Sequence, residues 1–133
     1  IDAYGEFARS LGIAFQIRDD ALGIWGEEAL TGKSATSDLR DKKKSYPVLI
    51  AFERAAPHDR AMLETLYARD TLDDDAIAAV LAILARVGAE AETERVAQEH
   101  YERALAALDR TGIDNEPQTH IRRLAEFLIR RAY

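Results

Sequence analysis

The stretch Gly12-Ile-Ala-Phe-Gln-Ile-Arg-Asp-Asp-Ala-Leu-Gly-Ile-Trp-Gly26 places two adjacent carboxylates inside an otherwise apolar helical pattern. Asp is a poor helix-interior residue, and burying two neighbouring charges is costly unless something neutralises them. Gln16 lies one turn before Asp19 and Asp20 and shares their side of the helix, because positions i, i+3 and i+4 form one face. An acidic cluster on a core-facing helix calls for a cation, and oxygen ligands suit Mg²⁺.

The composition is that of a globular protein. Of the 133 residues, 47% are hydrophobic and 32% are charged, which is enough for one domain with a buried core. The net charge of −6 argues against nucleic acid or an anionic membrane surface as the main partner. There is no cysteine, which excludes disulfides, zinc–thiolate sites and thiol catalysis. The chain opens with Ile1 rather than Met, so we expect a piece of a longer protein.

The hydrophobic pattern predicts helices almost throughout. Apolar residues recur at three- and four-residue steps, whereas the alternation typical of strands is absent. Pro47 fits a helix start, and Gly88 and Gly112 fit helix ends. No apolar run approaches the roughly 20 residues of a membrane span, so we expect no stable membrane insertion. The prediction is an all-α fold of five or six helices, over about residues 2–25, 47–54, 59–69, 73–87, 89–111 and 117–131.

Two groups of residues that resemble metal ligands have simpler explanations. Residues 73–75 are all Asp and precede an apolar helical pattern, where acidic residues cap the helix and favour its positive end. His58, His100 and His120 share no metal-ligand spacing, so we interpret them as surface or partly buried residues.

Charged residues of both signs follow the Asp pair in the chain. Carboxylates hold a divalent metal, the metal binds phosphate oxygens, and lysine ammonium groups cover the remaining phosphate charge. The combination therefore predicts a diphosphate site. An alternative is that Asp19 and Asp20 form salt bridges at a helix end, with Arg18 as a partner. The features of the predicted site, in chain order, are Gln16 with Asp19 and Asp20, then Thr31-Gly-Lys33, then Asp38-Leu-Arg-Asp41, then Lys42-Lys-Lys44 before Pro47.

This order and spacing resemble the second Asp-rich region of the trans-isoprenyl diphosphate synthases, the polyprenyl synthetase family. The resemblance covers roughly residues 11–55, and several motif elements in the right order make it far more specific than one Asp-Asp pair. The matching residues are Phe15, Gln16, Asp19, Asp20, Gly23, Gly32-Lys33, Asp38-Leu39 and Lys43-Lys44.

The resemblance implies an antiparallel helix bundle of the isoprenoid synthase type, with residues 1–133 as the C-terminal part of one helical domain. It implies Mg²⁺-dependent condensation of an allylic diphosphate with isopentenyl diphosphate, giving a C15–C20 or longer polyprenyl diphosphate. Asp19 and Asp20 are then expected as metal ligands, and Gln16 as a catalytic residue. Lys33 and Lys43 are expected to act in catalysis by binding diphosphate, with Asp38 beside them. For the intact protein the family implies a cytoplasmic homodimer.

Two departures keep other functions open. Gly23 stands at the third acidic position of the motif, which predicts the loss of one metal ligand, and the family's first Asp-rich motif is absent from this chain. We therefore expect the isolated chain to be inactive and to self-associate through exposed apolar surface. One alternative is a non-catalytic small or regulatory subunit of a heteromeric synthase, or a helical interaction domain. Another is a relative of the class I terpene synthases.

Overall fold

The computed structural model describes residues 2–26 and 36–130, and within these ranges the chain is helical with no strand. The long first helix, α1 (Ala3–Trp25), carries the Asp pair. The chain divides into two compact units: unit 1 contains residues 1–19 and 94–133, and unit 2 contains residues 20–93. The division falls inside α1 and inside α7 (Ala89–Asp109), so each of these helices contributes to both units.

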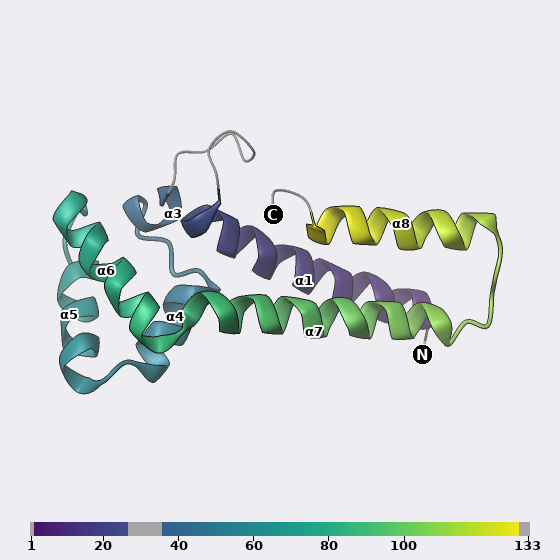
Figure 1. The fold of residues 1–133 in the computed structure, drawn as a ribbon, viewed down its shortest axis with the longest axis horizontal. Coiled ribbons are helices and arrows are strands. Elements are labelled where there is room, and N and C mark those ends of the chain that lie inside the picture. Colours follow the sequence, from purple (N-terminus) through teal and green to yellow (C-terminus); the bar gives the residue numbers. More distant parts are fainter. Residues whose placement is uncertain (1, 27–35, 131–133) are drawn as a thin grey trace. The chain divides into compact units, whose positions relative to one another are not determined.

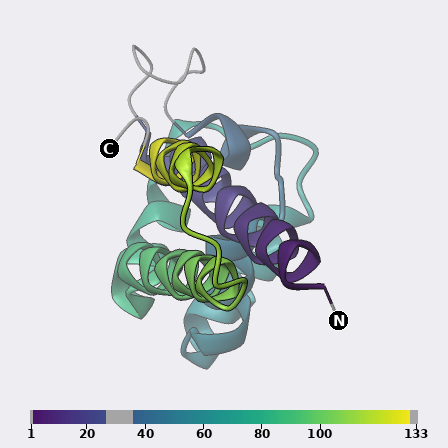
Figure 2. The ribbon, with the colours of Figure 1, turned by 90° about the vertical axis from the view of Figure 1, so that its right-hand side faces the viewer.

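Unit 1 is built from three helical segments. The N-terminal part of α1, the C-terminal part of α7 and α8 (Glu116–Arg130) run side by side in both views (Figures 1 and 2). Their buried apolar side chains form a small core, against which further apolar residues of α1 and α7 pack. The buried core residues are Ala14, Tyr101, Ala125 and Ile129.

Unit 2 holds the larger core, formed mainly by α4 (Tyr46–Arg54), α5 (Pro57–Tyr67) and α6 (Asp74–Val87). A one-turn helix, α3 (Ser37–Arg40), precedes them and buries Leu39 completely. Aliphatic side chains fill this core, as burial of apolar surface requires. Its fully buried large members include Ile24, Leu39, Val48, Leu63, Val80, Ile83 and Leu84.

The six predicted helices are confirmed, with ends that differ by one to a few residues. Asp73 caps α6 as expected, because its side chain accepts a hydrogen bond from the Ala76 N–H at 2.8 Å. Gly88 ends α6 in the left-handed conformation, with φ of 68°. The single turn α3 was not predicted; it lies between the first two predicted helices.

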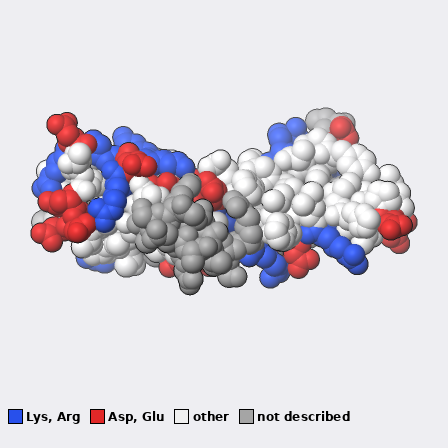
Figure 3. All heavy atoms as spheres, turned by 90° about the horizontal axis from the view of Figure 1, so that it is seen from above, with Lys and Arg blue, Asp and Glu red and all other residues white. Residues whose placement is uncertain are grey.

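The surface of the described chain combines charged and apolar regions. In Figure 3, broad areas of uncharged residues lie on the right, where Figure 1 places α8 and the beginning of α1. On α1, Ile13 is 44% exposed, and on α8, Leu124 and Phe127 are 58% and 66% exposed. Across residues 2–26 and 36–130, no helix is both long enough and apolar enough to cross a membrane.

Candidate functional site

Asp20 is the buried centre of a polar cluster in unit 2. Its side chain is 11% exposed, and its Oδ2 accepts a hydrogen bond from the backbone N–H of Tyr46 at 3.0 Å. That N–H belongs to the first turn of α4, where backbone donors have no partner within the helix. The neighbouring Ser45 is the N-cap residue of α4, but its side chain makes no capping hydrogen bond. Asp20 therefore caps α4 from another helix and neutralises its positive end.

Lys43 supplies the second contact of Asp20. Its ammonium lies 3.2 Å from Asp20 Oδ1 and 3.6 Å from Asp38 Oδ2, so it pairs with two carboxylates at once. The Lys43 side chain is still 43% exposed, whereas those of Asp20 and Asp38 are 11% and 9% exposed. The cluster is thus two nearly buried carboxylates joined by an ammonium that solvent and solutes can reach.

A tight turn after α3 brings Lys43 to this position. Lys42 adopts the left-handed conformation, with φ of 53°. The Lys43 N–H donates to the Asp38 carbonyl at 2.9 Å, and the Lys42 N–H donates to the Leu39 carbonyl at 3.0 Å. This pair of bonds is a Schellman motif, which ends a helix and reverses the chain. It places Asp38 and Lys43 within ion-pair distance of each other.

Gly23 lies directly against the carboxyl group of Asp38. A Cβ atom built on Gly23 would lie 2.0 Å from Asp38 Oδ2 and 2.4 Å from its Cγ, far inside van der Waals contact. Gly23 is one turn beyond Asp20 on α1, so the absence of a side chain there leaves the room that the Asp38 carboxyl group fills. Asp38 Oδ2 is buried, and no hydrogen-bond donor to it is found among the described residues.

Three neighbours complete the surroundings of the cluster. The Tyr67 hydroxyl is buried, and burial together with the negative charge of Asp38 raises the pKa of Tyr67 to about 12. The ammonium of Lys42 donates to the Arg69 carbonyl, and that of Lys44 lies 5.8 Å from the centre of the Phe52 ring. Of the three consecutive lysines, Lys43 is therefore the one that pairs with the two carboxylates.

The other three predicted site residues are Gln16, Asp19 and Lys33. Gln16 and Asp19 are on α1 within unit 1, the first exposed and the second half-buried. Lys33, with Thr31 and Gly32, lies outside the described residues. The cluster that the structure brings together is thus Asp20, Asp38 and Lys43.

The donor chemistry of the cluster fits a magnesium ion that shares its ligands with a phosphate. Within the described ranges, no three acidic or histidine side chains are grouped as a metal site. Mg²⁺ in proteins is usually held by one or two carboxylates, with phosphate oxygens and water completing its shell. Asp20 supplies one such carboxylate and Asp19 precedes it on α1, while the Lys43 ammonium can bind phosphate oxygens.

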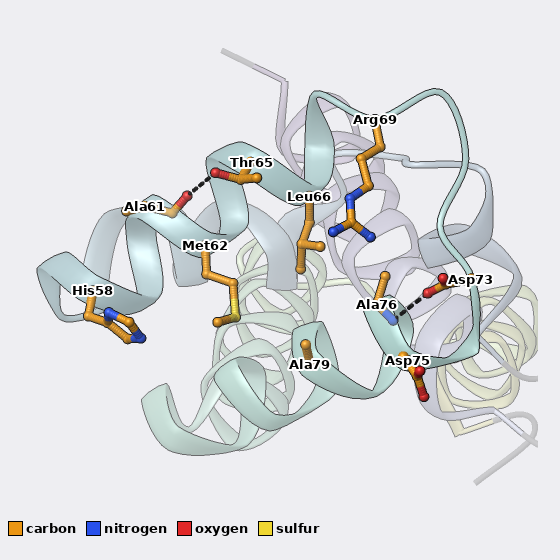
Figure 4. Close-up of a pocket in the computed structure, with 10 residues that line it drawn as sticks. All are labelled: His58, Ala61, Met62, Thr65, Leu66, Arg69, Asp73, Asp75, Ala76 and Ala79. Atoms are coloured by element: carbon orange, nitrogen blue, oxygen red, sulfur yellow. Dashed lines mark hydrogen bonds between the residues drawn. The ribbon is translucent and has the colours of Figure 1, made fainter.

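A separate cavity of about 640 Å³ lies between α5 and α6. Figure 4 shows Met62, Leu66 and Ala79 facing the space between the two helices. The carboxylate of Asp73 at its edge already caps α6. None of the predicted site residues lines this cavity, so we place the candidate site at the cluster.

The chain matches the family model "Polyprenyl synthetase" over residues 1–84. It belongs to the polyprenyl synthetase family. The (2E,6E)-farnesyl diphosphate synthase of Mycobacterium tuberculosis is 32% identical, with 98% of this chain and 37% of the relative covered. The geranylfarnesyl diphosphate synthase of Aeropyrum pernix is 34% identical, with 96% of this chain and 39% of the relative covered. The chain thus spans less than two fifths of the length of these relatives.

Solved structures of polyprenyl synthetases share the fold. A geranylgeranyl pyrophosphate synthase from Corynebacterium glutamicum, complexed with isoprenyl diphosphate and magnesium, is similar with a TM-score of 0.85 and 32% identity. The alignment covers 97% of this chain and 37% of that one. A polyprenyl synthetase from Streptomyces coelicolor gives a TM-score of 0.81 at 30% identity, over 93% of this chain and 38% of that one. The predicted isoprenoid synthase fold is confirmed.

One hydrogen bond and one electrostatic neighbour in this member of the family were not predicted from the sequence. The bond from the Tyr46 N–H to Asp20 could have been anticipated, because Pro47 marks a helix start and a helix start needs acceptors. Nothing in the sequence indicates that Tyr67 lies near Asp38, because the two are far apart in the chain.

Proposed function

We propose that the protein containing this chain is a prenyltransferase. It condenses an allylic diphosphate with isopentenyl diphosphate to a polyprenyl diphosphate of C15–C20 or longer. The observation that carries this proposal is the placement of Lys43 between Asp20 and Asp38, three residues of the motif quoted from the sequence. The named relatives make farnesyl, geranylgeranyl and geranylfarnesyl diphosphates, which supports this product class.

The cluster is suited to bind the diphosphate leaving group of the allylic substrate. The half-exposed ammonium of Lys43 binds its oxygens, while Asp20 and Asp38 hold that ammonium in one position. Asp19 and Asp20 are the proposed ligands of Mg²⁺, which when bound neutralises charge on the departing diphosphate. Lys33 contributes a second ammonium, Asp38 keeps Lys43 in register, and Gln16 orients the substrate.

The reaction then needs no covalent intermediate with the protein. The allylic C–O bond breaks, and its electron pair leaves with the diphosphate. The double bond of isopentenyl diphosphate attacks the allylic cation and forms the new C–C bond. Loss of a proton restores a double bond. Positive charge fixed beside the leaving group lowers the barrier of the first step.

The test is an assay of the protein encoded by the complete gene. It is incubated with geranyl or farnesyl diphosphate and isopentenyl diphosphate, with and without Mg²⁺. We expect Mg²⁺-dependent chain extension, and negligible turnover by the isolated chain. Lys43→Ala should lower kcat/KM by about 10- to 100-fold because a charge-assisted contact is lost. Lys44→Ala, whose ammonium lies by Phe52, is the control and should change it little. Absence of condensation by the complete protein would refute the proposal.

One observation favours a second candidate, a non-catalytic subunit of a heteromeric synthase. Both oxygens of Asp20 already have partners, so the cluster also makes sense as a purely structural clamp between α1 and α4. Calorimetric titration of the complete protein with inorganic pyrophosphate and Mg²⁺ separates the two. A catalytic role requires binding that Lys43→Ala weakens, whereas a structural clamp shows no binding.

A further inference from the structure

We propose that Gly23 is a positioning residue that fixes the Asp38 carboxyl group and, through it, the ammonium of Lys43. This deepens the proposed function, on which it rests for its link to diphosphate. Our expectation from the sequence was that Gly23 marks a lost metal ligand. The contact distances add a second role for Gly23, because the Asp38 carboxyl group occupies the space that a side chain at position 23 would fill.

A Cβ atom at position 23 would overlap the carboxyl group of Asp38. The three atoms nearest to a Cβ on Gly23 are Oδ2, Cγ and Oδ1 of Asp38, at 2.0, 2.4 and 3.0 Å. All three belong to the carboxyl group and none to the backbone. Gly23 is itself buried within α1, so the helix cannot simply tilt away without disturbing the core around Ile24. Any side chain at position 23 therefore displaces the carboxyl group of Asp38.

Displacing that group changes the balance around Lys43. Asp38 Oδ2, the atom in closest overlap, is also the atom 3.6 Å from the Lys43 ammonium. The same ammonium lies 3.2 Å from Asp20 Oδ1, which belongs to its second carboxylate partner. With Asp38 moved, Lys43 keeps one carboxylate instead of two and takes a new average position. A diphosphate that uses this ammonium then binds less well.

The chain provides a matched control on the same helix. Gly12 is also an interior residue of α1, but it is exposed, and nothing lies within 4 Å of a Cβ built there. Both substitutions replace a helical glycine of α1, so the overlap at position 23 is the main difference between them. We expect Gly12→Ala to raise the melting temperature of the complete protein by roughly 2–5 °C. Gly23→Ala should melt at least about 4 °C below Gly12→Ala.

A double-mutant cycle with Asp38→Ala isolates the coupling, because that substitution removes the three overlapping atoms. The melting-temperature gap between Gly23→Ala and Gly12→Ala should close in the Asp38→Ala background. For inorganic pyrophosphate with Mg²⁺, Gly23→Ala and Asp38→Ala should each raise Kd by about tenfold, and the double variant by no more than either. Gly12→Ala should leave Kd unchanged.

The outcomes are distinct. Additive effects on both melting temperature and Kd would overturn the coupling. A second outcome is that the melting-temperature gap closes in the Asp38→Ala background while Gly23→Ala leaves Kd unchanged. That result would overturn the positioning role, because the contact between Gly23 and Asp38 would then serve packing alone. If the protein with no substitution binds no pyrophosphate, the proposed function fails and the link to diphosphate fails with it. In that case the double-mutant cycle on melting temperature still measures the coupling between position 23 and Asp38.

Discussion

A single carboxylate, that of Asp20, joins three places in the chain. Its two oxygens meet the Lys43 ammonium and the first-turn N–H of α4. A nearly buried charge survives only with such partners, because desolvation without compensation costs several kcal/mol. The motif residue that was predicted to bind metal is thus also a residue on which local folding depends.

Removing this carboxylate should be costly. We expect Asp20→Ala to lower the free energy of unfolding by about 1–3 kcal/mol, because the Tyr46 N–H and the Lys43 ammonium both lose an acceptor. Asp20→Asn should cost less, since an amide oxygen still accepts from Tyr46. Asp70→Ala, at an exposed residue, is the control and should stay within about 0.5 kcal/mol. Urea unfolding followed by circular dichroism measures all three, and equal values for Asp20→Ala and Asp70→Ala would contradict the capping role.

Tyr67 should make stability fall at high pH. Burial and the charge of Asp38 raise its pKa from 10.0 to about 12, so the folded state favours the protonated phenol. This contribution is complete below pH 10, where both states are protonated, and is lost as the pH rises from 10 toward 12. Urea unfolding of Tyr67→Phe and of the unsubstituted protein, measured at each pH, isolates the contribution of the Tyr67 hydroxyl to the free energy of unfolding. The unsubstituted protein should lose stability relative to Tyr67→Phe over this window; a constant difference would refute the shift.

Among the helices, the junction between α3 and α4 decides the geometry of the site. It uses a lysine, Lys42, at the left-handed position where glycine is usual. The left-handed conformation costs an L-residue roughly 1–2 kcal/mol, which the two turn hydrogen bonds and the Lys42 contact with Arg69 offset. Strain of this kind is common beside functional groups.

Relief of the strain can be measured by comparing two variants of the same residue. Lys42→Gly and Lys42→Ala both lose the contact with the Arg69 carbonyl, but only glycine adopts the positive φ freely. We expect Lys42→Gly to be more stable than Lys42→Ala by about 1 kcal/mol. Chemical denaturation provides the comparison. Alanine equal to or better than glycine would show that the turn does not persist in solution.

The helices were predictable from sequence because periodicity and end residues agreed. Asp73 and Gly88 bracket α6 as capping rules require, and Pro47 stands in the first turn of α4. The α3 turn was not predictable, since Lys42 carries no turn preference. The motif predicted a lysine at the carboxylates, but the contact of Gly23 with Asp38 depends on packing between segments that are distant in sequence.

For the whole chain, the apolar surface of unit 1 is the feature with consequences in solution. Leu124 and Phe127 are more than half exposed on α8, and exposed apolar patches commonly mark contact surfaces. We expect the chain on its own to self-associate, and Phe127→Glu to shift sedimentation toward the monomer. Arg123→Ala, at an exposed polar position of the same helix, should leave the distribution unchanged. A monomeric chain without substitution would contradict this expectation.

The ion pair of the nearly buried Asp20 should respond to ionic strength differently from the exposed ion pairs of this chain. The pairs of Glu99 with Arg95 and Arg103 on α7 are about half exposed, so added salt screens them within a few ångströms of the surface. The Asp20 side chain is only 11% exposed, so its hydrogen bond to the α4 N–H should be screened much less. We therefore expect concentrated salt to weaken the ion pairs of α7 before it weakens the hydrogen bond between Asp20 and α4.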